Sequence, residues 1–256
     1  ESMSDQSPTV IVAIDRHHLE ELRVSLPTWV RNVDGFADFP FILIGDVESI
    51  DDDLYDDALL LANMCGVNNV TFRDVATVLP AGFPPRHDVT QRERMLTALA
   101  FAPSMVTTPT YLKLDTDTVA LPVRDKLLSA KVTGSRPIAA PRWGYTKPGH
   151  WLDTLDLWSD QTAPGNAKPY RVPSGGVAKS QRIISYAMLG DTAFANRCLH
   201  MLTSPRLPVP SQDTFYWYCA VLLGREVSRF STNETCWRHA GGNMRKLKEL
   251  AAEAME

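Results

Sequence analysis

The sequence predicts an α/β fold with a mostly parallel central sheet flanked by helices. Three short runs rich in β-branched and aromatic residues have the composition of buried strands: TVIVAID (9–15), FPFILIGD (39–46) and NVTFRDV (69–75). Each of the first two runs is followed by a segment with helical periodicity. Strands that alternate with helices along a chain form parallel sheets whose faces the helices cover.

The two segments between these strands have distinct helical signals. Residues 17–32 (HHLEELRVSLPTWVRN) place Leu19, Leu22 and Leu26 on one face. Residues 51–66 begin with acidic side chains, which suit the positive end of a helix dipole, and continue with an apolar body that ends at a glycine. We therefore expect both segments to be helices that pack on the sheet.

A third helix and a fourth strand are expected next. Residues 90–102 (TQRERMLTALAFA) begin with Thr90, a favourable N-cap, and residues 111–115 (YLKLD) form the fourth strand. Further along the chain, the sequence predicts a strand at 136–143, a loop at 161–173, and helices at 149–159, 211–224 and 245–256.

The length and composition favour one domain over residues 1–256. Apolar residues make up 44% of the 256 residues and charged residues 22%, which is ordinary for a globular domain. Ligands of parallel sheets collect beyond the carboxyl ends of the strands. We therefore expect residues 1–121 to form a nucleotide-binding half and residues 122–256, where the sequence texture changes, to form an acceptor-side half.

The charge and the apolar runs exclude some classes of partner. With 26 basic and 30 acidic residues the net charge is −4 and there is no long basic run, so the sequence predicts no nucleic-acid partner. Apolar stretches such as residues 216–223 fall short of the roughly 20 residues that a membrane-spanning helix needs. The four cysteines show no Cys-x-x-Cys spacing, which favours reduced thiols in the core.

Two aspartates at the end of the fourth strand are the main chemical signal. Because side chains alternate in a strand, Asp115 and Asp117 should leave on one side while Thr116 points away. Two carboxylates in one small space are costly unless a cation neutralises them, and Mg²⁺ or Mn²⁺ bound by carboxylates and substrate phosphates is the usual arrangement. A second Asp-x-Asp pair, Asp51 and Asp53, opens a predicted helix and is expected to be structural.

Other polar residues are expected near this pair. Asp15 and Asp46 end the first and second strands, where ligands of parallel sheets collect, and both are candidates for contact with a ligand. Arg94, on the preceding helix, is expected to pair with Asp115. Lys113 lies inside a predicted buried strand, so its amine should either reach the sheet edge or pair with a carboxylate.

The sequence DTDTV also fits the aspartate motif of haloacid-dehalogenase-like phosphatases, in which Asp115 would attack phosphorus. Those enzymes carry the motif on the first strand of their core domain, whereas three strand-like segments precede it here. This phosphatase function is therefore kept as an alternative.

Four segments in order along the chain resemble glycosyltransferases of the GT-A fold, in particular the β-1,3-galactosyltransferase and Fringe-like group. They are KLDTD (113–117), KPYRVPSGGVAKS (168–180), SQDTFYWYCAVLLG (211–224) and RHAGGNMRK (238–246). The chain departs from the group at Thr116, where a middle aspartate is usual, and at Gln212, where glutamate is usual. Because Gln-Asp also occurs in retaining families, the stereochemistry stays open.

The resemblance implies a GT-A glycosyltransferase of the hexosyltransferase type. It would move a sugar from a nucleotide diphosphate sugar, with UDP expected, to a glycan or other hydroxyl acceptor, with Mn²⁺ or Mg²⁺ as cofactor. Asp117 would bind the metal directly, Asp115 would help through the metal or the ribose, and His239 would complete the ligand set. Asp213 would be the base of an inverting transfer.

The resemblance also implies contacts to the donor and the acceptor. The expected donor contacts, in addition to Asp15, Asp46, Arg94, Lys113 and Asp115, are Ser174, Gly175, Gly176, Arg245 and Lys246. The expected acceptor contacts are the aromatic side chains of Trp143, Tyr145 and Trp151, which can stack on a sugar.

Two further alternatives concern activity and location. The departures at Thr116 and Gln212 also fit a non-catalytic nucleotide- or glycan-binding module. The first residues show no basic start followed by an apolar core, so no signal peptide is expected. A cytoplasmic location is the prediction, with the lumenal catalytic domain of a truncated secretory-pathway protein as the alternative.

Overall fold

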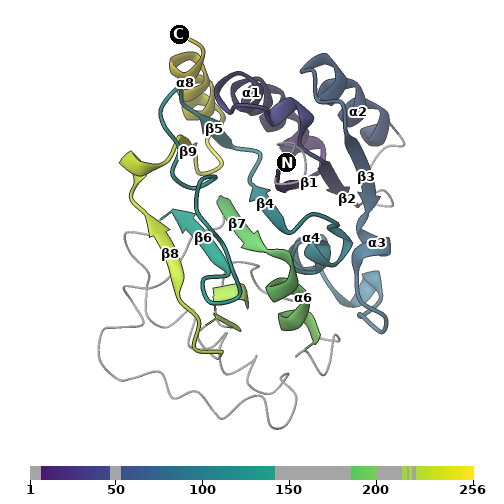
Figure 1. Cartoon of the computed structure of the whole chain (residues 1–256). Coiled ribbons are helices and arrows are strands. Elements are labelled where there is room, and N and C mark those ends of the chain that lie inside the picture. The colour runs from purple at the N-terminus through teal and green to yellow at the C-terminus, as the bar shows by residue number, and fades with distance from the viewer. Residues whose placement is uncertain (1–6, 47–52, 142–185, 201–214, 218, 221–222) are drawn as a thin grey trace.

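The structure is a computed structural model that describes residues 7–46, 53–141, 186–200, 215–217, 219–220 and 223–256. Its strands in chain order are β1 Thr9–Ile14, β2 Phe41–Gly45, β3 Val70–Asp74, β4 Thr110–Leu114, β5 Thr118–Ala120, β6 Ile138–Pro141, β7 Ala187–Asp191, β8 Val227–Phe230 and β9 Trp237–His239. Over the described residues, seven of them form one sheet in the order β3-β2-β1-β4-β7-β6-β8, and β5 pairs with β9 (Figure 1). The predicted fold class, a mixed α/β fold with a largely parallel sheet, is confirmed.

The first four strands of the large sheet are parallel to one another. β1 lies between β2 and β4, and Val10 is in register with Phe41 on one side and Leu112 on the other. β2 in turn pairs with β3. Since the strands run in the same direction and in register, the residues that follow β1, β2 and β4 reach the same edge of the sheet. This edge carries Asp15, Asp46 and Asp115.

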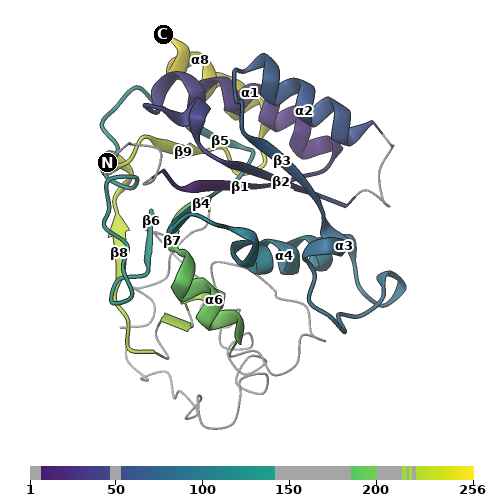
Figure 2. The same ribbon diagram turned by 45° about the vertical axis from the view of Figure 1, so that its right-hand side comes forward.

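Helices cover both faces of the sheet. The α-helices are α1 Arg16–Asn32, α2 Leu54–Met64, α3 Val75–Val78, α4 Gln91–Phe101, α6 Thr192–His200 and α8 Met244–Met255. The 3₁₀ helices are η2 Phe36–Asp38, η4 Arg86–Asp88, η5 Ala102–Met105 and η6 Thr232–Glu234. α1, α2 and α8 lie on one face, and α3, α4 and α6 lie on the other (Figure 2). β1 and β2 are therefore almost fully buried, as their composition predicts, whereas β3 at the edge of the sheet is only half-buried.

The predicted start of the third helix is confirmed in detail. The Thr90 hydroxyl accepts a hydrogen bond from the Glu93 backbone N–H at 3.2 Å, and the Glu93 carboxylate accepts one from the Thr90 N–H at 2.7 Å. These reciprocal bonds form a capping box, which satisfies two N–H groups that the first turn leaves without helical partners.

The second half of the chain adds the antiparallel strands. β7 runs antiparallel to β4 and to β6, and β8 is parallel to β6. The predicted strand at 136–143 is confirmed as β6, and the described residues 215–217 and 219–220 of the predicted helix at 211–224 are helical. A Cβ atom at Gly190 in β7 would lie 2.3 Å from the Tyr111 ring, so the close approach of β7 to β4 requires glycine there. The predicted helix at 149–159 and loop at 161–173 lie outside the described residues.

The small β5–β9 sheet joins the end of β4 to the C-terminal part of the chain. Thr118 is in register with His239, and Ala120 with Trp237. On α1, the indole N–H of Trp29 donates to the Thr118 carbonyl oxygen at 2.5 Å. The indole of Trp29 also packs edge-on against that of Trp237, with centroids 6.4 Å apart. This packing fixes the ribbon beside the edge of the large sheet where the acidic residues lie.

All four cysteines fall within the described ranges and are free thiols, three of them buried, as the sequence predicts. Among the helices that the structure describes, none is both long enough and apolar enough to cross a bilayer.

Candidate functional site

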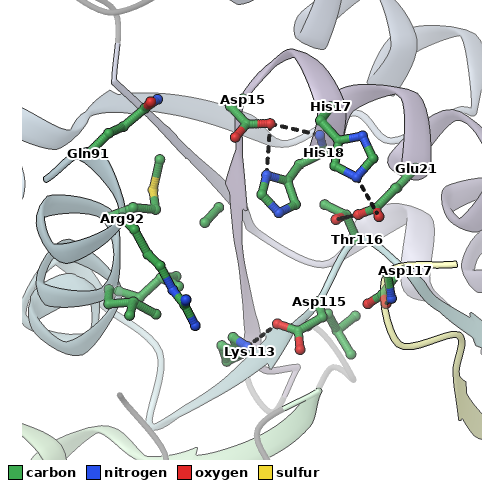
Figure 3. A pocket seen from close by; sticks show the side chains of 16 residues that line it. Asp15, His17, His18, Glu21, Gln91, Arg92, Lys113, Asp115, Thr116 and Asp117 are labelled. Atoms are coloured by element: carbon green, nitrogen blue, oxygen red, sulfur yellow. Dashed lines mark hydrogen bonds and ion pairs between the residues drawn. The ribbon is translucent and has the colours of Figure 1, made fainter. Parts of the chain in front are cut away.

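A cavity of about 570 Å³ opens at the carboxyl ends of β1 and β4, between α1 and α4. Figure 3 shows its polar side chains, which come from the start of α1, the start of α4, the strand β4 and the segment that follows it. Asp15, Lys113, Asp115 and Asp117, four of the predicted site residues, line this cavity. The edge of the sheet that the sequence indicates is therefore hollow and carries acidic groups, as a ligand site of an open parallel sheet does.

Asp115 and Asp117 belong to a turn and not to a strand, which corrects the geometry expected from strand alternation. β4 ends at Leu114, and the Thr118 N–H donates to the Asp115 carbonyl oxygen at 3.2 Å, so residues 115–118 form a β-turn that leads into β5. The two carboxylates still share one small space because the turn, and not the two-residue period of a strand, directs them there.

His239 completes a group of three potential metal ligands. Its Nε2 atom lies 3.1 Å from Asp117 Oδ1 and 4.0 Å from Asp115 Oδ2. One ligand atom from each residue fits within 4.8 Å of the others. The His239 ring is stacked on the ring of Tyr186, with centroids 5.0 Å apart and planes 4° apart. The register of β5 and β9 therefore brings His239 to the predicted carboxylate pair.

The environment of Asp117 favours its charged form. Burial raises the pKa of Asp117. Hydrogen bonds from His239 and from the Gly242 N–H, the latter at 2.5 Å, lower this pKa by more than burial raises it, so the net pKa lies below its ordinary value. Its side chain is only 9% exposed. A buried ionised carboxylate beside a second carboxylate and an imidazole is a ligand set that suits a divalent cation such as Mn²⁺.

Lys113 pairs with a carboxylate, which is one of the two outcomes expected for it. Its amine bonds to Asp115 Oδ1, and its side chain is 5% exposed. The charge of Asp115 is therefore partly balanced inside the site, whereas that of Asp117 is balanced by the N–H of Gly242 and by His239.

The expected pair between Arg94 and Asp115 is wrong. Arg94 Nε lies 3.4 Å from Asp46 Oδ2, and Arg86 Nη2 lies 3.6 Å from the same oxygen. Asp46 is fully buried, and a buried carboxylate at the end of β2 requires cationic partners, which α4 and η4 supply. Neither Asp46 nor Arg94 is among the residues that line the cavity.

Asp15 lies in the cavity wall, but its carboxylate is engaged with α1. Oδ1 accepts a hydrogen bond from the His18 backbone N–H at 2.8 Å and lies 2.8 Å from His18 Nδ1. The bond from the His18 side chain lowers the pKa of Asp15 to about 2, and the same bond raises the pKa of His18. Asp15 thus caps the helix and orients an imidazole whose other edge faces the cavity (Figure 3).

Asp15→Asn is expected to lower the pKa of His18 toward its ordinary value, because the amide keeps the helix cap and removes the negative charge. With the folded-state pKa of His18 raised, protonation of His18 stabilises the wild-type fold below pH of about 6.5, and this contribution is lost as pH rises through the folded pKa. NMR titration of the histidine rings measures the change. Asp34→Asn, at an exposed aspartate, is the control; an unchanged His18 titration in Asp15→Asn would contradict the pairing.

Two of the expected donor contacts, Arg245 and Lys246, lie away from the cavity lining. Arg245 is largely exposed on α8 and lies 3.4 Å from Glu249. The amine of Lys246 donates to the His239 carbonyl oxygen at 3.0 Å. Lys246 therefore contacts the backbone of a candidate metal ligand, and neither side chain lines the cavity. The other expected site residues lie outside the described residues: Trp143, Tyr145, Trp151, Ser174, Gly175, Gly176 and Asp213.

Several cavity residues were not predicted from the sequence. Gln91 and Arg92, at the start of α4, and His17, His18 and Glu21 on α1 all line the cavity. Their common signal is position, because each lies in the first turns of a helix whose N-terminus opens toward the sheet edge. Arg92 extends into the cavity, and no ion pair involves it within the part of the chain that the structure describes (Figure 3).

Comparisons with known proteins show the fold. No family model matches the chain, and no curated protein matches its sequence. The chain is similar to the apo structure of WbbM, a bifunctional glycosyltransferase (TM-score 0.54, 13% identity), over 90% of this chain and 40% of that one. It is similar to core-mannan synthase A from Aspergillus fumigatus in its Mn/GDP form (TM-score 0.54, 11% identity), over 94% and 76%.

The same fold also covers another kind of enzyme. A candidate glucose-1-phosphate thymidylyltransferase from Bacillus anthracis, in complex with a sucrose, matches with a TM-score of 0.52 and 12% identity over 98% of this chain and 96% of that one. The chain spans 40% of the length of WbbM. At these identities the similarity establishes architecture, and the chain has the α/β fold of GT-A glycosyltransferases.

Proposed function

We propose that this protein is a metal-dependent glycosyltransferase that moves a sugar from a nucleotide diphosphate sugar to a hydroxyl acceptor. The observation that supports this most directly is the group formed by Asp115, Asp117 and His239 at a cavity beyond the carboxyl ends of β1 and β4. The GT-A fold and the Mn/GDP form of one similar enzyme agree with it.

The three side chains fit the proposed cofactor, Mn²⁺ or Mg²⁺. Asp117 would bind the ion directly, with Asp115 and His239 completing the protein ligands, since carboxylate oxygens and an imidazole suit Mn²⁺. When bound, such an ion would neutralise the diphosphate of the leaving group. His239 is held in place by stacking on Tyr186, and Asp117 by the N–H of Gly242.

Arg92→Gln is expected to weaken binding of a nucleoside diphosphate by about tenfold, since the substitution removes a guanidinium directed into the cavity, where it would contact a phosphate. Binding of Mn²⁺ alone should be unchanged. Calorimetry with UDP or GDP in the presence of Mn²⁺ measures the effect. Arg23→Gln, at a partly exposed arginine of α1 that pairs with Glu20, is the control; equal nucleotide affinity in Arg92→Gln would exclude this contact.

The finer features of the reaction are part of the proposal. We propose that the donor is UDP-linked, that the transferred group is a hexose, and that Asp213 is the base of an inverting transfer. These three features rest on the resemblance to the Fringe-like group. Calorimetry of UDP, GDP and CDP with and without Mn²⁺ tests the metal and the base together. Incubation with a panel of nucleotide sugars and Mn²⁺ should then show slow hydrolysis of one donor, and no response to any donor would refute the function.

Nucleotidylyl transfer is the second candidate, because the similarity to the Bacillus anthracis protein covers 98% of this chain. It predicts release of pyrophosphate from a nucleoside triphosphate in the presence of a sugar 1-phosphate, and glycosyl transfer does not. The phosphatase alternative predicts phosphate release from aryl phosphates and trapping of beryllofluoride at Asp115. A non-catalytic module would bind a nucleotide or glycan and give no product in any of these assays.

A further inference from the structure

We infer that Glu21 on α1 positions the proposed metal ligands by holding the Asp115–Thr118 turn through the side chain of Thr116. The inference rests on the proposed metal site and adds a positioning pair to it. Thr116 and Glu21 are each 3% exposed, although both border the cavity. The Thr116 hydroxyl donates to Glu21 Oε2 at 2.5 Å.

Glu21 is itself fixed in orientation. His17, one turn earlier on α1, places its Nε2 atom 3.2 Å from Glu21 Oε1. Both carboxylate oxygens of Glu21 therefore have partners, one on its own helix and one in the turn. Figure 3 shows His17, Glu21 and Thr116 grouped above Asp115 and Asp117. A buried carboxylate held in this way is a rigid acceptor, because turning it away would leave a buried charge without its partners.

The backbone of the turn also bonds to other segments. The Asp115 N–H donates to the Tyr186 carbonyl oxygen at 2.9 Å, and the Ala240 N–H donates to the Asp117 carbonyl oxygen at 2.9 Å. These bonds tie the turn to the segments that carry Tyr186 and His239. Two bonds tie it to α1: the Thr116 hydroxyl donates to Glu21, and the Trp29 indole N–H donates to the Thr118 carbonyl oxygen. Thr116 lies between the two aspartates, so its side-chain bond sets the orientation from which both carboxylates leave the backbone.

This arrangement also accounts for threonine between the two aspartates. An aspartate at position 116 would place its carboxylate against the buried carboxylate of Glu21, and two like charges in that space are unfavourable. A hydroxyl donates a hydrogen bond there instead. The residue at 116 therefore matches the acceptor on α1.

The test measures binding of Mn²⁺ alone by electron paramagnetic resonance, at a temperature at which circular dichroism shows each variant to be folded. Thr116→Val should weaken Mn²⁺ binding about tenfold, and Thr116→Ser should restore it, because groups behind metal ligands typically contribute 10- to 100-fold in affinity. Glu21→Met removes the acceptor from the other side and should have the same effect. The double variant should lose no more than either single variant.

Thr97→Val is the matched control, since Thr97 is a buried threonine of α4 whose hydroxyl donates to the Glu93 carbonyl oxygen at 2.8 Å. It should lower the thermal stability and leave Mn²⁺ affinity unchanged. Mn²⁺ affinity in Thr116→Val and Glu21→Met equal to that of the unchanged protein would overturn this inference alone. Absence of Mn²⁺ binding in the unchanged protein would overturn the proposed metal site and this inference with it.

Discussion

Asp117→Asn is expected to remove Mn²⁺ binding, with a loss of affinity greater than about 100-fold, because the loss of a group behind a ligand already costs about 10- to 100-fold. Asp117 is the least exposed of the three candidate ligands, and its ionised form is stabilised by His239 and by the Gly242 N–H. An amide can keep the bond from Gly242 but supplies no charge to the cation. Electron paramagnetic resonance of Mn²⁺ and calorimetry of Mn²⁺-dependent nucleotide binding measure the loss.

Asp53→Asn is the matched control, because Asp53 belongs to the second Asp-x-Asp pair and is exposed at the start of α2. It should bind Mn²⁺ like the unchanged protein. The pKa of Asp117 is lowered in the folded state, so the ionised Asp117 stabilises the unchanged protein above about pH 4, and this stabilisation is lost as pH falls through the folded pKa. The free energy of unfolding of Asp117→Asn should therefore change less in acid than that of the unchanged protein. Mn²⁺ binding retained in Asp117→Asn would show that the ion binds elsewhere and would contradict the proposed site.

Trp29→Ala is expected to lower the free energy of unfolding by about 3–5 kcal/mol, the range for removal of a buried aromatic side chain. Trp29 is fully buried in α1, donates to the Thr118 carbonyl oxygen, and packs against Phe36 and Trp237. The substitution would leave a cavity between α1 and the β5–β9 ribbon and an unpaired carbonyl oxygen. Urea denaturation followed by circular dichroism measures the loss.

Two controls separate the contributions of volume and hydrogen bonding. Trp29→Phe keeps much of the aromatic volume and removes the N–H, so it should cost about 1–3 kcal/mol, the penalty for a buried group left without its partner. Leu60→Ala, at a side chain that is 59% exposed on α2, should change stability by less than about 0.5 kcal/mol. A loss for Trp29→Ala no larger than that for Leu60→Ala would contradict the packing described for the ribbon.

The periodic segments of the chain are predictable from sequence because they depend on local chemistry. The runs at β1 and β2 are almost continuously apolar and buried, as central parallel strands require, whereas β4 carries Lys113 and the edge strand β3 is half-buried. Thr90 caps α4 through bonds that reach no further than Glu93. The aspartates that end these strands meet at one edge for a simple reason, which is that parallel strands in register place their carboxyl ends together.

Pairings between side chains from distant segments are not predictable in this way. Arg94 and Arg92 are two positions apart on α4, which points them in different directions: Arg94 meets the buried Asp46, and Arg92 enters the cavity. Residues three or four positions apart lie on the same side of a helix, whereas residues two positions apart do not. A small error in the expected orientation of α4 would therefore exchange the roles of Arg92 and Arg94. The sequence places both on the helix but does not identify which one faces the site.

The sequence by itself determined the layered α/β architecture and the acidic sheet edge with Asp115 and Asp117, because burial periodicity and the direction of parallel strands are encoded within short segments. Only the tertiary structure decided that Asp115 and Asp117 leave a turn instead of a strand, that His239 faces them and that Thr116 is tied to Glu21. Those contacts depend on the register of β5 with β9 and on the packing of α1 beside the turn, which join residues far apart in the chain. No local pattern specifies such a register, since it is set by the sum of packing contacts across the whole core.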